Sequence, residues 1–206
     1  MNFTTKIVNW YSKNKRDLPW RINKNPYSVW LSEIILQQTK IQQGLPYYLR
    51  FMDKYPNVFS LSQASEQDIL KLWEGLGYYS RARNLHKTAK LIVRDLEGVF
   101  PSTYTGLLNL PGIGKYTASA ISSICYEERK AVLDGNVFRL LSRYFNIDFP
   151  INSPLGLKYF EQLSFDLLPE INIGDYNQAL MDFGSTVCKP KLAKCDTCIL
   201  KEECGA

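Results

Sequence analysis

Apolar residues recur three and four positions apart along most of the 206-residue chain. Examples are Ile69, Leu70 and Trp73 and, later, Val137, Leu140, Leu141 and Tyr144. This spacing is that of α-helices with one buried face, and no stretch shows the convincing two-residue alternation of a strand. The pattern predicts an all-α protein.

Turn signals that contain proline or glycine interrupt these helical stretches. They stand at Asn25-Pro26, Tyr55-Pro56, Gly75-Leu76-Gly77, Phe100-Pro101, Leu110-Pro111-Gly112 and Phe149-Pro150. They imply about eight to ten helices of ordinary length. The sequence has no low-complexity linker and no fixed-period repeat, so two domains would share a continuous hydrophobic interface rather than a tether.

The composition is that of a globular protein, because 45% of the residues are hydrophobic and the chain is long enough to bury a sizeable core. Lys6 and Asn9 lie inside the only apolar stretch near the N-terminus, which excludes a signal-peptide core or a membrane span there. We therefore expect a cytoplasmic protein, associated with the nucleoid if it is bacterial, that has no membrane partner.

The charge balance and the single histidine restrict the chemistry. A formal net charge of +5 permits an anionic partner such as nucleic acid but does not demonstrate one. His86 is the only histidine, which excludes a hydrolytic mechanism built on several histidines. General acid and base work would have to fall to carboxylates, tyrosines or lysines.

Four of the five cysteines lie close together near the end of the sequence, at Cys188, Cys195, Cys198 and Cys204. In a reducing compartment, such a group is more typical of metal ligands than of disulfides. Its spacing can serve one zinc ion or one iron–sulfur cluster. Zinc sites usually pair two close knuckles, and only Cys195 and Cys198 are closely spaced here, so the spacing favours a cluster and leaves zinc open. Cys125 lies in an apolar helical stretch and is interpreted as a core residue.

A helix-hairpin-helix is predicted between a short helix at residues 103–109 and a second helix at residues 115–125. The stretch LPGIG forms the turn between them. Gly112 and Gly114 let the turn backbone approach a ligand, and the first N–H groups of the second helix suit a phosphate oxygen. Such a contact holds DNA by its backbone and reads no sequence, although an ordinary helical turn explains the stretch equally well.

Two carboxyl groups, those of Glu33 and Asp134, are expected to have different electrostatic surroundings. A helix is predicted from Ser28 to Gln38, and the neighbours of Glu33 at helical spacing are Val29, Trp30, Leu36 and Gln37. Because none of these neighbours is charged, we expect a raised pKa for Glu33, as a proton donor needs. Asp134 precedes a helix that begins near Val137, where the helix dipole favours the ionised form. A proton donor and an anion together suit cleavage through an oxocarbenium-like transition state. Taken alone, an ordinary helix acid and a helix cap remain the simpler interpretations.

Six stretches follow one another between Leu18 and Cys204: LPWR, WLSEIILQQT, GLGYYSRARNLHKTA, LPGIGKYTASAI, LDGNVFR and NQALMDFGSTVC. Together with the four-cysteine spacing, they resemble the MutY family of adenine DNA glycosylases, within the helix-hairpin-helix superfamily of base-excision enzymes. The resemblance implies a six-helix barrel domain at 22–128, with the helix-hairpin-helix at about 103–126. A second helical domain would combine 1–21 and 129–206. It would carry one [4Fe-4S] cluster on the four clustered cysteines, and the cleft between the domains would hold a flipped base.

The resemblance also implies catalytic roles. Glu33 matches the acid that protonates adenine at N7, and Asp134 matches the carboxylate that stabilises the sugar cation or its adduct before water attacks. Tyr116 and Asn136 match supporting positions in the active site. Related enzymes that cut the DNA strand carry a nucleophilic lysine in this turn and helix, and a tyrosine cannot form their Schiff base. We therefore expect a monofunctional glycosylase that leaves an abasic site.

The same resemblance implies contacts to double-stranded DNA that contains a mismatch. The matching positions are Gln37, Gln38 and Tyr78, which fill or open the base stack, and Gly112, Gly114 and Lys115 in the phosphate-binding hairpin. Extruding a base costs about a few kcal/mol, which such contacts must offset. We expect the protein to act as a monomer.

The expected reaction is hydrolysis of the N-glycosidic bond of adenine opposite guanine or 8-oxoguanine, in base excision repair. MutY enzymes normally continue into a C-terminal domain that inspects the opposite base, whereas this sequence stops soon after Cys204. The preference between guanine and 8-oxoguanine therefore stays open. An alternative is a thymine or uracil mismatch glycosylase, since short relatives of that kind share this layout and a similar Gly-Lys-Tyr-Thr stretch. The blocks 36–39 and 134–136 look more like the adenine enzymes. A second alternative is an iron–sulfur DNA-binding sensor of damage or redox state, against which the presence of both Glu33 and Asp134 argues.

Overall fold

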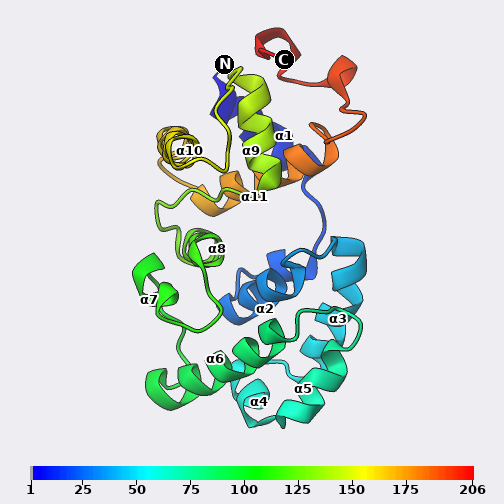
Figure 1. The fold of residues 1–206 in the computed structure, drawn as a ribbon, viewed down its shortest axis with the longest axis vertical. Helices are drawn as coiled ribbons and strands as arrows, with labels where there is room; N and C mark the ends of the chain where they lie inside the picture. The colour runs from blue at the N-terminus through cyan, green and yellow to red at the C-terminus, as the bar shows by residue number, and fades with distance from the viewer. Residues whose placement is uncertain (1) are drawn as a thin grey trace. The chain divides into compact units, whose positions relative to one another are not determined.

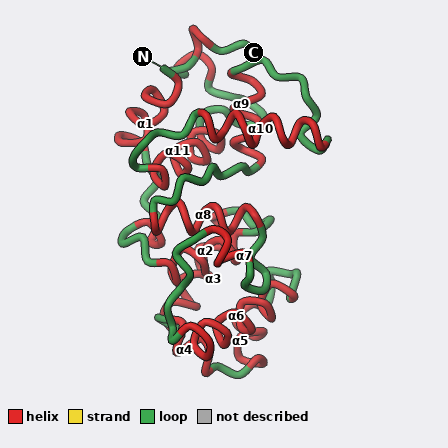
Figure 2. The backbone as a smooth tube through the Cα atoms, turned by 90° about the vertical axis from the view of Figure 1, so that its left-hand side faces the viewer, coloured by secondary structure: helices red, strands yellow, loops and turns green. Residues whose placement is uncertain are grey.

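The computed structural model describes residues 2–206, which form eleven α-helices and three short 3₁₀ helices joined by turns and loops (Figure 1). Within this range there is no strand, as the backbone tube in Figure 2 also shows. The prediction of an all-α protein is confirmed. The described helices are slightly more numerous than expected because α4 (Val58–Gln63) and α5 (Glu66–Trp73) are separated without proline or glycine.

The chain divides into two compact units. One is the continuous segment Leu18–Tyr126, and the other joins the N-terminal segment up to Asp17 to the residues from Glu127 onward. We call them the continuous unit and the split unit. Each has its own helices and its own buried side chains.

The continuous unit is built around a helix that is buried on nearly all sides. Its elements are η1 (Pro19–Arg21), α2 (Pro26–Leu36), α3 (Ile41–Lys54), α4, α5, α6 (Ser80–Leu96), α7 (Tyr104–Leu108) and α8 (Lys115–Tyr126). Helix α2 contacts η1, α3, α6 and α8. Trp30 on α2 is fully buried, and its ring centroid lies 5.4 Å from that of Phe100. A helix that is apolar all round must be covered on all sides, and α2 accordingly fills the centre of this unit.

The split unit brings both ends of the chain together. Its elements are α1 (Phe3–Asn14), α9 (Gly135–Tyr144), α10 (Pro154–Asp166), α11 (Ile173–Thr186), η2 (Cys195–Thr197) and η3 (Lys201–Glu203). Helix α11 contacts both α1 and α9. On α11, Asp182 is fully buried and accepts a hydrogen bond of 2.7 Å from Nε of Arg16, which follows α1. A buried carboxylate needs such a partner, so this ion pair joins the N-terminal segment to the C-terminal half.

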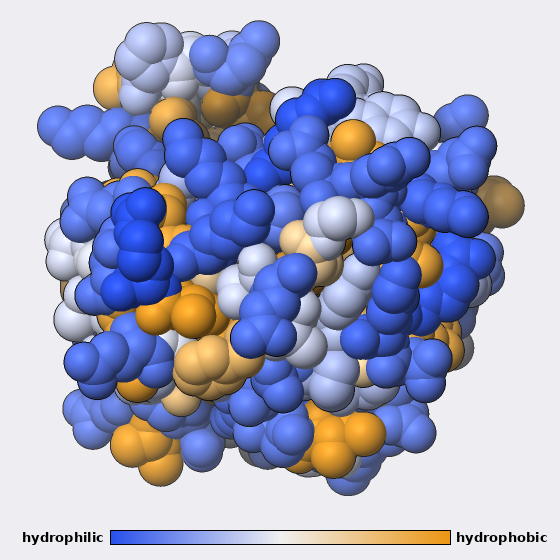
Figure 3. All heavy atoms as spheres, turned by 90° about the horizontal axis from the view of Figure 1, so that it is seen from below, coloured by the Kyte–Doolittle hydropathy of each residue, from blue (hydrophilic) through white to orange (hydrophobic). Residues whose placement is uncertain are grey.

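The surface is largely hydrophilic on the face drawn in Figure 3, where hydrophobic residues form separate spots. Exposed apolar side chains include Tyr78 and Leu192. Among the described residues, no helix has the length and apolar character that crossing a membrane requires.

Candidate active site

Glu33 is the only charged residue of α2 and is half-buried. The helix begins at Pro26, where Oδ1 of Asn25 accepts hydrogen bonds from the backbone N–H groups of Tyr27 (2.9 Å) and Ser28 (3.3 Å). An asparagine cap followed by proline is a strong local signal for a helix start, so the sequence sets the register of α2. That register turns the apolar residues inward and leaves Glu33 at the edge of the buried surface.

Helix α8 passes within electrostatic reach of Glu33. Burial raises the pKa of the Cys125 thiol on α8 to about 12, the charge of Lys24 opposes this rise, and the charge of Glu33 adds to it. Cys125 is half-buried, which is less buried than a core residue.

Asp134 is the N-cap of α9, as the sequence predicts. Its Oδ1 accepts hydrogen bonds from the backbone N–H groups of Asn136 (2.9 Å) and Val137 (2.8 Å). Its Oδ2 accepts a bond of 2.7 Å from the side-chain amide of Asn136. Both carboxylate oxygens are therefore engaged at the start of the helix, which holds the group in one orientation.

A hydrogen-bond network extends from Asn136 to the cysteine loop. Nη2 of Arg139 donates to Oδ1 of Asn136 (2.8 Å) and to the carbonyl of Gly184 (2.6 Å), and its Nε donates to the carbonyl of Cys188 (2.9 Å). A Cβ on Gly184 would lie only 2.7 Å from the carbonyl oxygen of Asn136, so α11 passes directly against the start of α9. The role of Arg139 could not be predicted from the sequence pattern, although this residue follows Asn136 by three positions on the same helix. No sequence signal marks Gly184.

The four clustered cysteines share one loop of the split unit, and none of them forms a disulfide. Burial raises the pKa of Cys198, and the charges of Cys188, Cys204 and Cys195 add to this rise, so the four sulfurs lie within electrostatic reach of one another. Nη1 of Arg143 donates to the sulfur of Cys188 at 3.4 Å. Across residues 2–206, no three or more His, Cys, Asp or Glu side chains are arranged as a ready-made metal site. The donor set itself fits an iron–sulfur centre, since it offers four soft ligands and a neighbouring cation.

The predicted helix-hairpin-helix is confirmed, and it consists of α7, a tight turn and α8. Gly112 in the turn has φ +77°, and a Cβ there would lie 2.7 Å from Cβ of Asn84 on α6. The hydroxyl of Thr88, also on α6, donates to the carbonyl of Pro111 at 2.8 Å, which fixes the turn on that helix. Around Gly114 the space for a Cβ is open, so a ligand could approach its backbone there.

The remaining predicted site residues also lie in the continuous unit. Lys115 is exposed at the first position of α8, and Tyr116 follows it, half-buried. Gln37 is half-buried at the C-terminus of α2, next to the exposed Gln38, which has φ +56°. Tyr78 is 67% exposed and has φ +46°. The unit thus holds Glu33 together with the predicted DNA-contact residues, while Asp134, Asn136 and the four cysteines belong to the split unit.

A family model agrees with this arrangement of helices. The model described as HhH-GPD superfamily base excision DNA repair protein matches residues 31–153, which is more than half of the chain. The chain belongs to the HhH-GPD superfamily of base excision DNA repair proteins.

Two similar curated proteins are both named adenine DNA glycosylase. A relative from Buchnera aphidicola subsp. Baizongia pistaciae, named adenine DNA glycosylase, is 44% identical over 207 residues, which cover 98% of this chain and 57% of the relative. A human protein of the same name is 39% identical over 213 residues, which cover 99% of this chain and 39% of that protein. This chain therefore spans less than two thirds of the length of these relatives.

Solved structures have the same fold. A thermostable thymine-DNA glycosylase is 29% identical with a TM-score of 0.88, and the match covers 98% of this chain and 93% of that one. A non-covalent endonuclease III–DNA complex matches with a TM-score of 0.81 at 18% identity over 98% of this chain and 91% of that one. At 18% identity, the likeness to endonuclease III shows only that the two proteins share a fold.

Proposed function

We propose that this protein is a monofunctional DNA glycosylase that hydrolyses the N-glycosidic bond of adenine mispaired with guanine or 8-oxoguanine in duplex DNA. One observation carries the proposal: the chain has both carboxyls that such a cleavage needs. Glu33 is a half-buried acid on an otherwise uncharged helix, and Asp134 is a carboxylate fixed by three hydrogen bonds at a helix start. The names of the relatives that match nearly the whole chain support adenine as the base.

The proposed reaction divides the work between these two groups. Glu33 donates its proton to N7 of the adenine as the bond between N9 and the sugar breaks, so that the bonding electrons leave with a neutral base. Asp134 stays anionic and stabilises the positive charge that develops on the deoxyribose. Water then forms a bond to C1′ and gives a proton to the Glu33 carboxylate, which restores the acid and leaves an abasic site. Tyr116 and Asn136 support the two groups, and Tyr116 offers no amine for a Schiff base.

The proposed DNA contacts lie in the hairpin between α7 and α8, in the turn after α2 and in the turn before α6. Duplex DNA would be held at a phosphate by the backbone of Gly112 and Gly114 and by Lys115, where the N-terminus of α8 favours an anion. Gln37, Gln38 and Tyr78 would enter the base stack when the adenine is extruded. The family model of base excision DNA repair proteins that matches residues 31–153 supports a DNA partner here. The protein would act as a monomer in the cytoplasm.

The proposed cofactor is one [4Fe-4S] cluster held by Cys188, Cys195, Cys198 and Cys204. When bound, it would supply a redox-capable inorganic centre that cross-links the loop. The proposal is supported by the four thiols of the loop and by Arg143, whose guanidinium would offset part of the negative charge of the thiolates. Iron and sulfide content after anaerobic purification tests it, and a colourless protein that contains zinc would contradict it.

A second candidate function is excision of thymine or uracil opposite guanine. The specific observation in its favour is the likeness to a thymine-DNA glycosylase, which has a TM-score of 0.88 at 29% identity. The lower sequence identity, 29% against 44%, makes it the weaker candidate.

A single-turnover assay distinguishes excision of adenine from excision of thymine or uracil. The purified protein is incubated with duplexes that contain adenine opposite 8-oxoguanine, adenine opposite guanine, thymine opposite guanine, or uracil opposite guanine, and alkali then reveals abasic sites. We expect product from the adenine duplexes and no strand cleavage before alkali. Product from the guanine mismatches with thymine or uracil alone would replace the adenine assignment, and cleavage without alkali would contradict the monofunctional mechanism.

A further inference from the structure

One guanidinium joins the two turns that carry the proposed base-stack residues. Arg81 lies on α6, near its start, and is half-buried. Its Nη1 donates to the carbonyls of the last turn and end of α2, at Ile34 (3.1 Å), Ile35 (3.1 Å) and Gln37 (2.7 Å). Its Nη2 donates to the carbonyls of Leu76 (3.2 Å) and Gly77 (3.4 Å). We call Arg81 and these five carbonyls the Arg81 network.

Each half of the network satisfies groups that the local backbone leaves without partners. The last carbonyls of a helix have no intrahelical donor, and a cation is favourable at that negative end of the dipole. The carbonyls of Leu76 and Gly77 belong to a turn in which Gly75 has φ +94° and Gly77 has φ +70°. A planar fork with five N–H donors can serve both sets of carbonyls at once, which the single ammonium of a lysine cannot do.

The residues that follow both sets of carbonyls have strained backbones. Gln38 comes directly after Gln37 and has φ +56°, and Tyr78 comes directly after Gly77 and has φ +46°. Side chains other than glycine rarely adopt this left-handed region, and they persist there only when surrounding contacts require it. The guanidinium also lies 5.1 Å from the ring centroid of Trp73 and 5.8 Å from that of Tyr78, within the range of cation–π attraction.

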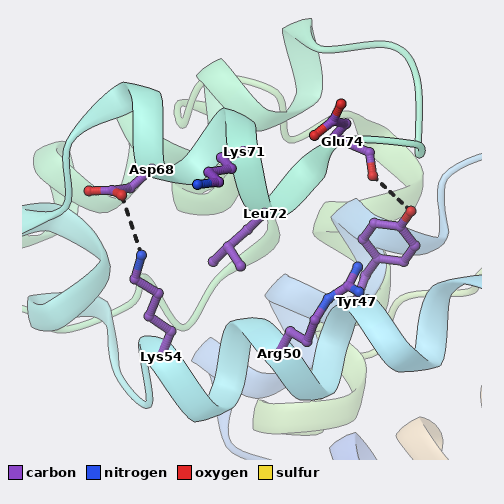
Figure 4. Close-up of a pocket in the computed structure, with 7 residues that line it drawn as sticks. All are labelled: Tyr47, Arg50, Lys54, Asp68, Lys71, Leu72 and Glu74. Atoms are coloured by element: carbon purple, nitrogen blue, oxygen red, sulfur yellow. Dashed lines mark hydrogen bonds and ion pairs between the residues drawn. The ribbon is translucent and has the colours of Figure 1, made fainter.

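Two further side chains donate hydrogen bonds to the turn. Nε1 of Trp73 donates to the carbonyl of Gly77 at 2.9 Å. The hydroxyl of Tyr47 on α3 donates to the carbonyl of Glu74 at 2.8 Å, at one end of a surface pocket between α3 and α5 (Figure 4). Of the hydrogen bonds that these three side chains make to the turn and to the end of α2, those of Arg81 reach both.

We propose that Arg81 is a positioning residue that holds Gln38 and Tyr78 in preset conformations and couples their turns, so that both enter the base stack together when the target nucleotide is extruded. This inference rests on the proposed function for its consequence in catalysis. The coupling of the two turns is a property of the protein alone and can be measured without DNA.

Hydrogen exchange of the intact protein, read by mass spectrometry on peptides, tests the coupling with three variants. R81K keeps the charge but loses the fork, so amides in both 36–39 and 74–79 should exchange at least about tenfold faster, since each segment loses a support. Y47F removes only the bond to Glu74 and should affect 74–79 alone. R94K changes an exposed arginine on the same helix, paired with Asp95, and should affect neither segment. Unchanged exchange at 36–39 in R81K would overturn the coupling.

Two measurements with DNA test the positioning role. R81K should slow single-turnover excision at least about tenfold, because small misplacements of reacting groups cost that much, while its affinity for an undamaged duplex should change less than about threefold. The rise in fluorescence of 2-aminopurine at the target position, which reports unstacking, should also fall. Wild-type rates and fluorescence in R81K would overturn the role even if exchange increases. If the wild-type protein excises no base at all, the proposed function fails, and the exchange data alone decide whether Arg81 couples the turns.

Discussion

The region around Glu33 and the region around Asp134 each carry a carboxyl that we propose to be catalytic, but they fix it in different ways. Asp134 is held by its sequence neighbours, since three hydrogen bonds from Asn136 and Val137 engage both of its oxygens. Glu33 takes its position from the packing of a whole helix, because α2 is buried against four other elements and has no other charged residue.

This difference teaches what each carboxyl is suited to do. The three hydrogen bonds hold the Asp134 carboxyl at the start of α9, the place that we propose for the anion. Glu33 is the one charged residue of α2, the place that we propose for the acid. Hydrolysis of a glycosidic bond needs one group of each kind, so the contrast between the two regions is itself part of the proposed mechanism.

The largest effect is expected when the proton of Glu33 is removed from the reaction. E33Q is nearly isosteric but cannot act as an acid, so single-turnover excision should fall by about 10²- to 10⁴-fold. Duplex affinity should persist, and the free energy of unfolding should stay within about 0.5 kcal/mol, as for most substitutions outside the core. Excision at the wild-type rate would mean that another group donates the proton.

The next largest effect is expected at Asp134, where two substitutions distinguish the role of its charge from its role as a helix cap. D134N keeps an oxygen for the N–H groups of Asn136 and Val137, and asparagine caps helices about as well as aspartate, so stability should hardly change. Excision should still fall about 100-fold or more, because the anion beside the sugar is lost. D134A removes the cap as well and should cost a further ~1 kcal/mol in urea unfolding. Full activity in D134N would reduce Asp134 to a structural cap.

A smaller effect should arise without touching either carboxyl. G184A places a methyl group against the backbone of Asn136, so α11 and the start of α9 must move apart. We expect a loss of about 1–3 kcal/mol in unfolding free energy and roughly tenfold slower excision. G135A serves as the matched control for stability, because the space around its Cβ is open. Equal free energies of unfolding for G184A and G135A would show that α11 and α9 have room for a methyl group between them.

The smallest effect concerns the other helix cap. N25A removes the two bonds to the start of α2 and should cost ~1 kcal/mol in unfolding free energy, about as much as the loss of the cap in D134A. Excision should stay at the wild-type rate at temperatures where the protein is folded, because α2 is held by its packing. A large loss of activity in N25A would instead mean that the cap of α2 positions Glu33.

What the sequence predicts well is local. The start of α2 after Asn25-Pro26 and the cap at Asp134 follow from a few adjacent residues, and the structure has both. The glycines and the proline of the LPGIG stretch likewise mark the hairpin between α7 and α8. These features depend on backbone groups within one turn of the residues that satisfy them, so a single stretch of sequence contains the whole interaction.

What the sequence could not reveal depends on distant partners. The pairing of Arg16 with the buried Asp182 joins positions 166 residues apart. The five carbonyls that accept from Arg81 belong to two turns, and carbonyls leave no signature in the residue types around them. The cysteine spacing restricts the donor set but not the metal, because zinc and iron–sulfur clusters use the same thiolates.

The central claim is that Glu33 and Asp134 act on one extruded adenine nucleotide. The most direct measurement is a crystal structure of the protein on a duplex that carries a 2′-fluoro-stabilised adenosine, which resists cleavage, opposite 8-oxoguanine. We predict that the adenine lies outside the base stack, with N7 in hydrogen-bond distance of the Glu33 carboxyl and C1′ within about 4 Å of an oxygen of Asp134. A bound duplex in which the adenine remains stacked, or in which either carboxyl contacts no part of the extruded nucleotide, would contradict the account.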